Sequence, residues 1–265
     1  MPRRLDAELV HRGLARSREA AKELIESGRV SVAGLLVPKP ASQVRSDADI
    51  HLESPPDAYV SRGAHKLIGA LDRWMPHGLV VDGRHALDAG ASTGGFTQVL
   101  LERGAAEVLA VDVGYGVLAW EVRSDPRVHV RERMNIRHAL PEDMPYAPDL
   151  IVADLSFISL RTVLPALVGL AAPAADFVLM VKPQFEVGRE DVGDGVVRDR
   201  SLRARAVLDV ANAMQALGLG VRDVVASPLP GPSGNVEYFV WATRGVELHP
   251  DLAACIEAAV TEGPS

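Results

Sequence analysis

Two things are scarce in this sequence, cysteine and long apolar runs, and each absence excludes classes of protein. Cys255 is the single cysteine among 265 residues, so the chain can form no internal disulfide and no cysteine-rich zinc site. No apolar run approaches the ~20 residues of a membrane span, and residues 1–6 lack the apolar region of a signal peptide. The eight histidines show no spacing typical of metal ligands. We therefore expect a cytoplasmic protein with no structural metal and no stable membrane association.

Charge is distributed unevenly along the chain. The formal net charge is −7 at pH 7, which by itself is not typical of a nucleic-acid-binding protein. Residues 1–45, however, carry nine lysines and arginines against five acidic residues, a local charge of 9 − 5 = +4. A local basic surface, more than the total charge, sets the potential that a phosphate backbone meets. Nucleic acid therefore remains a candidate partner for the first part of the chain.

Residues 1–58 are predicted to form a small α+β domain. Apolar residues at helical spacing predict one helix from Leu5 to Leu14 and a second helix that Ser17 caps and Gly28 ends. A hairpin over 30–37 and a strand over 50–52 follow. The run Ser54-Pro-Pro-Asp57 is typical of a linker, so we place interdomain residues at 59–62.

Residues 63–265 are predicted to form a second domain in which strands and helices alternate. Strands are expected over 86–90, 107–113, 127–131, 149–154, 176–182, 221–226 and 236–243, and helices over 65–74, 95–103, 116–122, 160–170 and 201–217. This alternation predicts an α/β fold with a mostly parallel sheet covered on both faces. The last two strands have no helix between them, so we expect an antiparallel hairpin at the sheet edge.

A glycine-rich turn, Asp88-Ala-Gly-Ala-Ser-Thr-Gly-Gly-Phe96, follows the first of these strands. Glycines let backbone approach a ligand closely, helix amides face it, and a carboxylate about twenty residues on, here Asp112, can bind ribose hydroxyls. The spacing is not the dinucleotide fingerprint. It resembles the first motif of class I S-adenosylmethionine-dependent methyltransferases, which implies a Rossmann-like sheet with an antiparallel last strand; an ordinary tight turn is the alternative. The predicted cofactor-binding residues are Asp88, Gly90, Ala91, Ser92, Thr93, Gly94, Gly95, Phe96, Asp112, Val113 and Asp154.

Four charged residues outside this turn are the candidate catalytic residues: Lys66, Asp154, Lys182 and Glu237. Asp154 and Lys182 end parallel strands, and ligands bind at the carboxyl ends of such strands. Lys182 follows the apolar run Val-Leu-Met-Val, and a buried amine beside a second cation can be neutral and accept a proton from an alcohol. Separate surface salt bridges are the alternative.

In this order the four residues resemble the tetrad of the FtsJ-like ribose 2′-O-methyltransferases. The segment after Asp154 reads Leu-Ser-Phe, whereas methyltransferases acting on base amino groups generally carry Pro-Pro-aromatic there. Carbon-5 pyrimidine methyltransferases need a cysteine nucleophile, and Cys255 lies far toward the C-terminal end. Both observations favour an oxygen target.

The N-terminal domain resembles the S4-type RNA-binding domain in Arg4-Leu-Asp6, Ala15-Arg-Ser-Arg18 and Leu24-Ile-x-x-Gly-x-Val30. Guanidinium groups and free backbone amides would meet at the start of the second helix and bind one anion. Structured RNA is the expected ligand, and a solvated basic face is the alternative. The predicted RNA-binding residues are Arg3, Arg4, Arg12, Arg16, Ser17, Arg18, Lys22, Lys39, Arg62, Arg133 and Arg137.

Over its whole length the chain is similar to the TlyA family. Further motifs carry this resemblance: Ser61-Arg-Gly-x-His-Lys-Leu, Ala153-Asp-Leu-Ser-Phe-Ile-Ser, Val181-Lys-Pro-Gln-Phe-Glu and Pro230-Gly-Pro-Ser-Gly-Asn-x-Glu-Tyr-Phe. The resemblance implies transfer of a methyl group from S-adenosyl-L-methionine to the ribose 2′-hydroxyl of cytidines in the 16S and 23S RNA of ribosomal subunits, and a link to capreomycin-type antibiotic sensitivity. One departure is Tyr59, where relatives often have tryptophan.

The size and asymmetry of such a substrate favour a monomer. Two other functions stay open. One is a catalytically silent RNA-binding factor in ribosome assembly, and the other is a haemolysin, a label that family members have carried.

Overall fold

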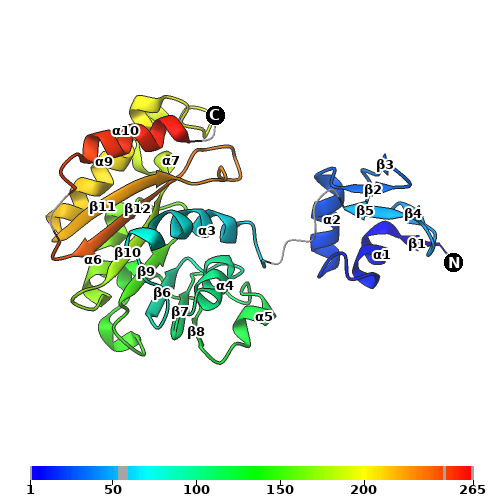
Figure 1. The fold of residues 1–265 in the computed structure, drawn as a ribbon, viewed down its shortest axis with the longest axis horizontal. Coiled ribbons are helices and arrows are strands. Elements are labelled where there is room, and N and C mark those ends of the chain that lie inside the picture. Colours follow the sequence, from blue (N-terminus) through cyan, green and yellow to red (C-terminus); the bar gives the residue numbers. More distant parts are fainter. Residues whose placement is uncertain (1, 53–58, 247–248, 264–265) are drawn as a thin grey trace. The chain divides into compact units, whose positions relative to one another are not determined.

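The structure, a computed structural model, describes residues 2–52, 59–246 and 249–263. The chain divides into two units, Met1–Ala58 and Tyr59–Ser265, which we describe separately (Figure 1). The predicted linker Ser54–Asp57 lies outside the described residues. Tyr59 donates from its hydroxyl to Glu102, and the backbone amide of Val60 donates to the side chain of Gln98. The first residues of the second unit are therefore held against the helix that follows its glycine turn.

The first unit contains two helices and two small sheets. Helices α1 (Leu5–His11) and α2 (Arg18–Glu26) pack over a core that includes Leu9 and Ile25. Strand β2 (Val30–Val32) lies between β3 (Leu35–Leu36) and β5 (Ile50–Leu52), antiparallel to both. The Ser17 side chain accepts from the amide of Ala20 and caps α2, as predicted.

Two features of this unit differ from the sequence prediction. Helix α1 ends at His11, three residues early, because Gly13 adopts a left-handed conformation with φ +71°. Strand β1 (Arg3–Arg4) pairs antiparallel with β4 (Gln43–Val44), which was not predicted. A two-residue strand has no periodicity from which it could be predicted.

The second unit is built on a sheet of seven strands in the order β11-β12-β10-β9-β6-β7-β8. The strands are β6 (His85–Ala89), β7 (Glu107–Val111), β8 (Val128–Arg131), β9 (Leu150–Ala153), β10 (Asp176–Val181), β11 (Leu219–Ala226) and β12 (Tyr238–Arg244). Strand β12 runs antiparallel to both β10 and β11, and the pairs among β10, β9, β6, β7 and β8 are parallel. The predicted Rossmann-like sheet with an antiparallel last strand is confirmed.

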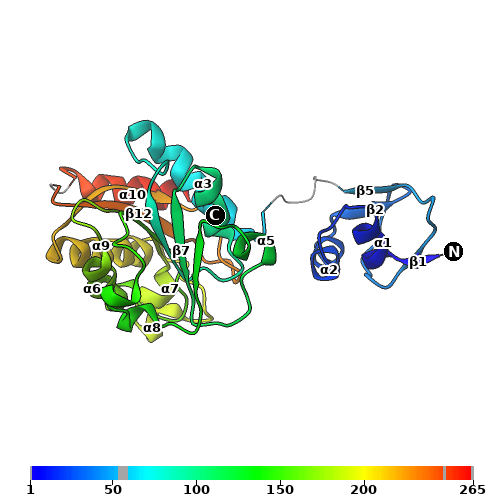
Figure 2. The ribbon, with the colours of Figure 1, turned by 90° about the horizontal axis from the view of Figure 1, so that it is seen from below.

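Helices cover both faces of this sheet, because side chains alternate between its faces along each strand. Leu87 and Ile151 pack with α6, α9 and α10, whereas their neighbours Ala86 and Leu150 pack with α3 and α4. Figure 2 shows α3 and α6 on opposite sides of the strands. The longer helices are α3 (Gly63–Trp74), α4 (Gly95–Glu102), α6 (Leu160–Leu170), α9 (Arg200–Ala216) and α10 (Leu252–Glu262). The short ones are α5 (Trp120–Arg123), α7 (Pro183–Glu186), α8 (Arg189–Val192), η1 (Met75–His77), η2 (Ile136–His138) and η3 (Pro141–Asp143).

Helix α10 was not predicted. Asp251 caps it, and Leu252, Ile256 and Val260 bury one face against β11 and α9. Helix α5 was predicted over 116–122 but begins only at Trp120, because Ala119 before it has an extended backbone with ψ 143°. Within the described residues, no helix has the length and apolar character needed to cross a bilayer.

The strand order places the site. Strand β6 is the first strand of this sheet along the chain, and it lies between β7 and β9. From β6 the chain runs outward through β7 to β8, and it then returns to β9 on the other side of β6. The carboxyl ends of β6 and β9 are therefore the topological switch point where open α/β sheets bind ligands. The glycine turn follows β6, and Asp154 follows β9 directly.

Candidate active site

The glycine turn lies directly against the end of β9. Gly90 has φ +88°, and a Cβ atom there would lie 2.7 Å from the backbone oxygen of Asp154. The amide of Ser92 donates to Asp112 Oδ2 at 2.8 Å, and the amide of Gly114 donates to Oδ1 at 2.7 Å. Glycine is therefore required at position 90, and the Asp112 carboxylate is fixed at the end of β7.

Two hollows open around this turn, and both are lined by Gly90, Ser92, Asp154 and Ser156. The larger has a volume of about 450 Å³, which is in the range of small-molecule sites. The smaller has a volume of about 240 Å³. The larger is further lined by Val111, Asp112, Val113, Met134, Asn135, Ile136, Leu155, Phe157, Ile158 and Val163. The smaller is further lined by Ser61, Arg62, Gly63, Lys66, Ala91, Thr93, Gly95, Phe96, Lys182 and Pro232.

Asp88 lies fully buried beneath the turn. Its Oδ2 accepts from the Thr97 hydroxyl at 2.6 Å, whereas Oδ1 has no hydrogen-bond partner among the described residues. Burial raises the pKa of Asp88 to about 7, and the charges of Asp154 and Asp112 act in the same direction while the Thr97 hydrogen bond opposes them. Asp88 lines neither hollow, but a cationic or hydrogen-bond-donating group bound at the turn would satisfy Oδ1, and a positively charged nucleoside cofactor carries such a group.

Lys182 lines the smaller hollow and contacts two residues that line both hollows. Its Nζ is 2.6 Å from Asp154 Oδ1 and donates a hydrogen bond of 2.8 Å to the hydroxyl of Ser156. The side chain of Lys182 is 9% exposed and that of Asp154 is 23% exposed. The sequence led us to expect that Asp154 and Glu237 orient the two lysine amines, and Asp154 is the carboxylate that contacts Lys182.

Lys66 forms a second and deeper ion pair. Its Nζ donates to Glu237 Oε2 at 2.5 Å, and the side chains are 5% and 1% exposed. Glu237 Oε1 is buried without a hydrogen-bond partner among the described residues. A Cβ atom at Gly231 would lie 2.6 Å from that oxygen, so the turn before β12 closes tightly over the pair.

The four candidate catalytic residues therefore lie as two ion pairs. Three of them, Lys66, Asp154 and Lys182, line the smaller hollow, and Glu237 supports Lys66. Sequence reasoning missed Ser156, although it lies in the motif that was singled out. It also missed Met134 to Ile136, which the strand-end rule, applied to β8, would have found.

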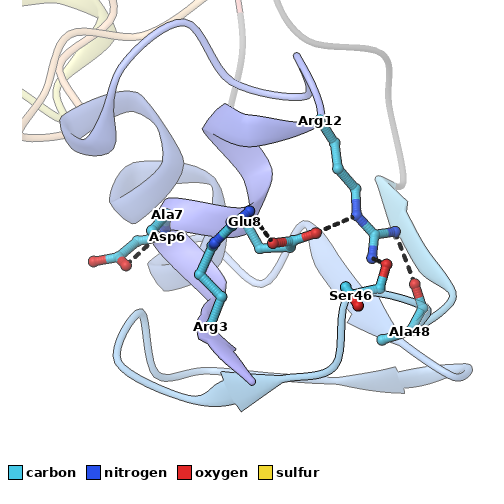
Figure 3. Close-up of polar contacts among 7 residues, drawn as sticks. All are labelled: Arg3, Asp6, Ala7, Glu8, Arg12, Ser46 and Ala48. Atoms are coloured by element: carbon cyan, nitrogen blue, oxygen red, sulfur yellow. Dashed lines mark hydrogen bonds and ion pairs between the residues drawn. The ribbon is translucent and has the colours of Figure 1, made fainter. Parts of the chain in front are cut away.

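The predicted RNA-binding residues of the first unit are mostly ion-paired. Arg3 and Arg12 contact Glu8, as Figure 3 shows, and Arg4 and Arg18 contact Asp6. The Nζ of Lys22 lies 3.8 Å from Oε1 of Glu26. The Ser17 side chain caps α2, and Arg16 and Lys39 belong to the same unit.

The other three predicted RNA-binding residues lie in the second unit. Arg62 lines the smaller hollow. The Arg133 guanidinium lies 4.1 Å from the ring centre of the exposed Tyr115, and the amide of Arg137 donates to Asn135. Arg133 and Arg137 thus flank the segment that lines the larger hollow.

Comparisons with known proteins identify both units. The family model described as FtsJ-like methyltransferase matches residues 59–244, and the model described as S4 domain matches residues 3–50. The chain is 56% identical over 266 residues to the 16S/23S rRNA (cytidine-2′-O)-methyltransferase TlyA of Mycobacterium tuberculosis, and the alignment covers 98% of each chain.

Solved structures are also similar to this chain. A Streptococcus thermophilus protein, provisionally described as a hemolysin, is 36% identical, covers 98% of this chain and 95% of its own, and has a TM-score of 0.78. A Listeria monocytogenes protein, provisionally described as an S-adenosylmethionine-dependent methyltransferase, is 18% identical, covers 67% of this chain and 99% of its own, and shares the fold with a TM-score of 0.50. The chain therefore belongs to the TlyA family of FtsJ-like methyltransferases and carries an S4 domain at its N-terminal end.

Proposed function

We propose that this protein transfers a methyl group from S-adenosyl-L-methionine to the ribose 2′-hydroxyl of cytidines in 16S and 23S ribosomal RNA. The family and the name of the Mycobacterium tuberculosis relative support this reaction. The observation that carries it is the position of Lys182, which lines the smaller hollow and contacts Asp154 and Ser156, two residues that line both hollows.

The larger hollow is the proposed cofactor site. When bound, S-adenosyl-L-methionine supplies an electrophilic methyl carbon on a sulfonium sulfur. Asp112, at the end of β7, would accept hydrogen bonds from ribose hydroxyls, and the glycine turn would allow close approach of the backbone. The unpartnered oxygen of Asp88 would receive a hydrogen bond from the charged amino group, directly or through water.

The smaller hollow is the proposed site for the acceptor nucleotide. Lys182 forms an ion pair with Asp154 and donates one hydrogen bond to Ser156, and as an ammonium it would have an N–H left to donate to a ribose oxygen and orient it. In its neutral form, the Lys182 amine would instead accept the proton of the 2′-hydroxyl as that oxygen bonds to the methyl carbon and the methyl group leaves the sulfonium sulfur, a general-base role typically worth ~10²–10⁴-fold in rate. Lys66, held by Glu237, lines the same hollow.

Ribosomal RNA within ribosomal subunits is the proposed partner. The arginines of the S4 unit would bind its phosphates, and Arg62, Arg133 and Arg137 would extend the contact around the two hollows. We place the reaction in the cytoplasm and the enzyme in the monomeric state, because one large asymmetric substrate leaves no role for a second copy.

Methyl transfer to purified ribosomal subunits tests the proposal. Wild type should label both subunits at cytidine 2′-oxygens, mapped by resistance to alkaline cleavage. Lys182→Ala should lose activity ~10²-fold or more while still binding the subunits. Arg198→Ala removes an exposed ion pair with Asp194 and serves as a control that should leave activity unchanged.

The outcome also separates the alternatives. RNA binding by wild type without methylation would favour the catalytically silent assembly factor. Methylation confined to a base nitrogen or carbon would refute the assigned oxygen target. An intact enzyme is also expected to raise capreomycin-type antibiotic sensitivity in cells that otherwise lack the modification.

A further inference from the structure

Two acidic side chains lie buried beneath the arginines of the first unit. Asp6 and Glu8 are on α1, and their side chains are only 7% and 2% exposed. The arginines that they contact are much more exposed, with Arg3 at 47%, Arg4 at 46% and Arg18 at 59%. The acids thus form the base of a surface whose outer layer is guanidinium groups.

Each carboxylate oxygen of Asp6 accepts two hydrogen bonds, and the donors are Arg4, Ala7 and Arg18. Arg4 donates to it twice, from Nε at 3.1 Å and from Nη2 at 2.7 Å, which is the two-bond geometry that fixes a guanidinium plane. Arg18, the first residue of α2, donates at 3.0 Å, and the amide of Ala7 donates at 2.7 Å. Arg4 holds the pKa of Asp6 at about 2, so this carboxylate stays ionised.

Glu8 accepts hydrogen bonds from two further arginines, Arg3 and Arg12 (Figure 3). Arg12 donates to one of its oxygens at 2.9 Å and Arg3 donates to the other at 3.0 Å. Arg12 also donates to the backbone oxygens of Ser46 and Ala48, so it ties α1 to the segment before β5. Arg12 is therefore largely a structural residue, whereas Arg3 uses one of its five N–H groups here and can offer others to a ligand.

We propose that Asp6 and Glu8 are positioning residues that hold Arg3, Arg4 and Arg18 as a preformed phosphate-binding array for structured RNA. This inference rests on the proposed function, in which the first unit binds ribosomal RNA. Arginine side chains lose rotamer freedom when they bind a ligand, and side chains that are already ordered lose less. Arg4 and Arg18 share one carboxylate, so their remaining donors keep a fixed separation that a phosphate backbone can match.

Simple charge counting predicts the opposite effect of these acids. A carboxylate on a basic surface repels phosphate, so its removal should strengthen RNA binding. The array requires the carboxylate, so its removal should weaken RNA binding. The sign of the change in affinity for the variant Asp6→Asn therefore decides between the two.

The first unit contains a matched control pair. Arg45 donates twice to Asp47, at 2.9 and 2.8 Å, with the same two-residue spacing as Arg4 and Asp6. These side chains are 80% and 66% exposed, and Asp47 holds no second arginine among the described residues. Asp47→Asn thus removes the same charge from the same unit without disturbing a buried anchor.

The test is binding of the full-length protein to purified ribosomal subunits at one fixed salt concentration. We expect Asp6→Asn to weaken binding about tenfold, because Arg4 and Arg18 must then be ordered on binding. Asp47→Asn should stay within about twofold of wild type or bind slightly tighter. In methyl transfer, Asp6→Asn should raise KM for the subunits and leave kcat unchanged.

A charge-conserving pair keeps the proposal testable where Asp6→Asn unfolds the unit. Arg4→Lys preserves charge but removes the two-bond contact, so it should also weaken binding, whereas Arg45→Lys should not. In a variant that already carries Arg4→Gln and Arg18→Gln, Asp6→Asn should have no further weakening effect.

Three results would overturn the inference. The first is that Asp6→Asn binds as tightly as Asp47→Asn, and the second is that Arg4→Lys binds like wild type. The third is that Asp6→Asn still weakens binding about tenfold when Arg4 and Arg18 are both replaced by glutamine. Failure of wild type to bind subunits at all would instead refute the proposed function, and the inference with it.

Discussion

The buried pair of Lys66 and Glu237 makes a strong prediction about stability. Lys66→Met removes the amine but keeps the length of the side chain, and it leaves the Glu237 carboxylate 1% exposed with neither oxygen paired by a cation. Breaking one partner of a buried ion pair costs about 3–5 kcal/mol in the free energy of unfolding. For a unit of this size, about 2–4 °C per kcal/mol gives a fall in Tm of roughly 6–20 °C.

Tryptophan fluorescence can follow this unit alone, because Trp74, Trp120 and Trp241 all lie in it. Thermal and urea unfolding should show Glu237→Gln destabilised to a similar extent. The double variant Lys66→Met with Glu237→Gln should return to within about 2 kcal/mol of wild type, because no buried charge remains unpaired. Asp72→Asn is the control, since Asp72 lies on the same helix in a more exposed pair with Arg103 and should cost about 0–1 kcal/mol.

The double variant also separates folding from chemistry. It should be folded yet lose methyl transfer, because Lys66 lines the hollow proposed for the acceptor nucleotide. Single variants that cost less than about 1 kcal/mol, or a double variant as unstable as the sum of both, would refute the account of this pair as a desolvated, coupled unit.

Three further predictions concern other parts of the site. Gly90→Ala should cost about 1–3 kcal/mol and abolish cofactor binding measured by calorimetry, because its Cβ would meet the backbone of Asp154 at φ +88°. Gly231→Ala should lower methyl transfer by displacing Glu237, whereas Gly169→Ala, with open space around its Cβ, should not. Burial raises the pKa of Asp88 from 3.8 to about 7, so the folded protein keeps this proton at a pH where the unfolded chain has lost it. The resulting contribution to the free energy of unfolding is fully present below pH ~4 and is lost as the pH rises through 7. Wild type should thus lose about 4 kcal/mol over this range relative to Asp88→Asn, and an identical pH dependence of the two proteins would contradict the burial argument.

Much of the fold could be predicted because local patterns determine it. Alternating apolar strands and helices predicted a mostly parallel sheet, and the glycine turn with Asp112 and Asp154 at strand ends located the larger hollow, which is the proposed cofactor site. Helix α10 carried the same kind of signal, since Leu252, Ile256 and Val260 recur at helical spacing, and was overlooked.

The contacts that the sequence could not give are those between distant segments. Lys66 and Glu237 are 171 residues apart, and no spacing rule pairs them. The expectation that Asp154 and Glu237 orient the two lysines left open which carboxylate contacts which amine, and the packing of β9 beside β10 brings Asp154 to Lys182. Likewise, Asp6 and Glu8 read as ordinary helix acids until the fold brings Arg18 and Arg3 to them.

The antiparallel last strand has a consequence for how the molecule is made. Strand β12 inserts between β10 and β11, and the residue just before it completes the pair with Lys66. Chains emerge from the ribosome N-terminal end first. During translation one edge of β10 therefore stays unpaired until β12 is made, and the S4 unit and the glycine turn are synthesised well before the last of the four candidate catalytic residues. A nascent chain that already contacts ribosomal RNA would remain inactive until β12 has paired with β10 and β11.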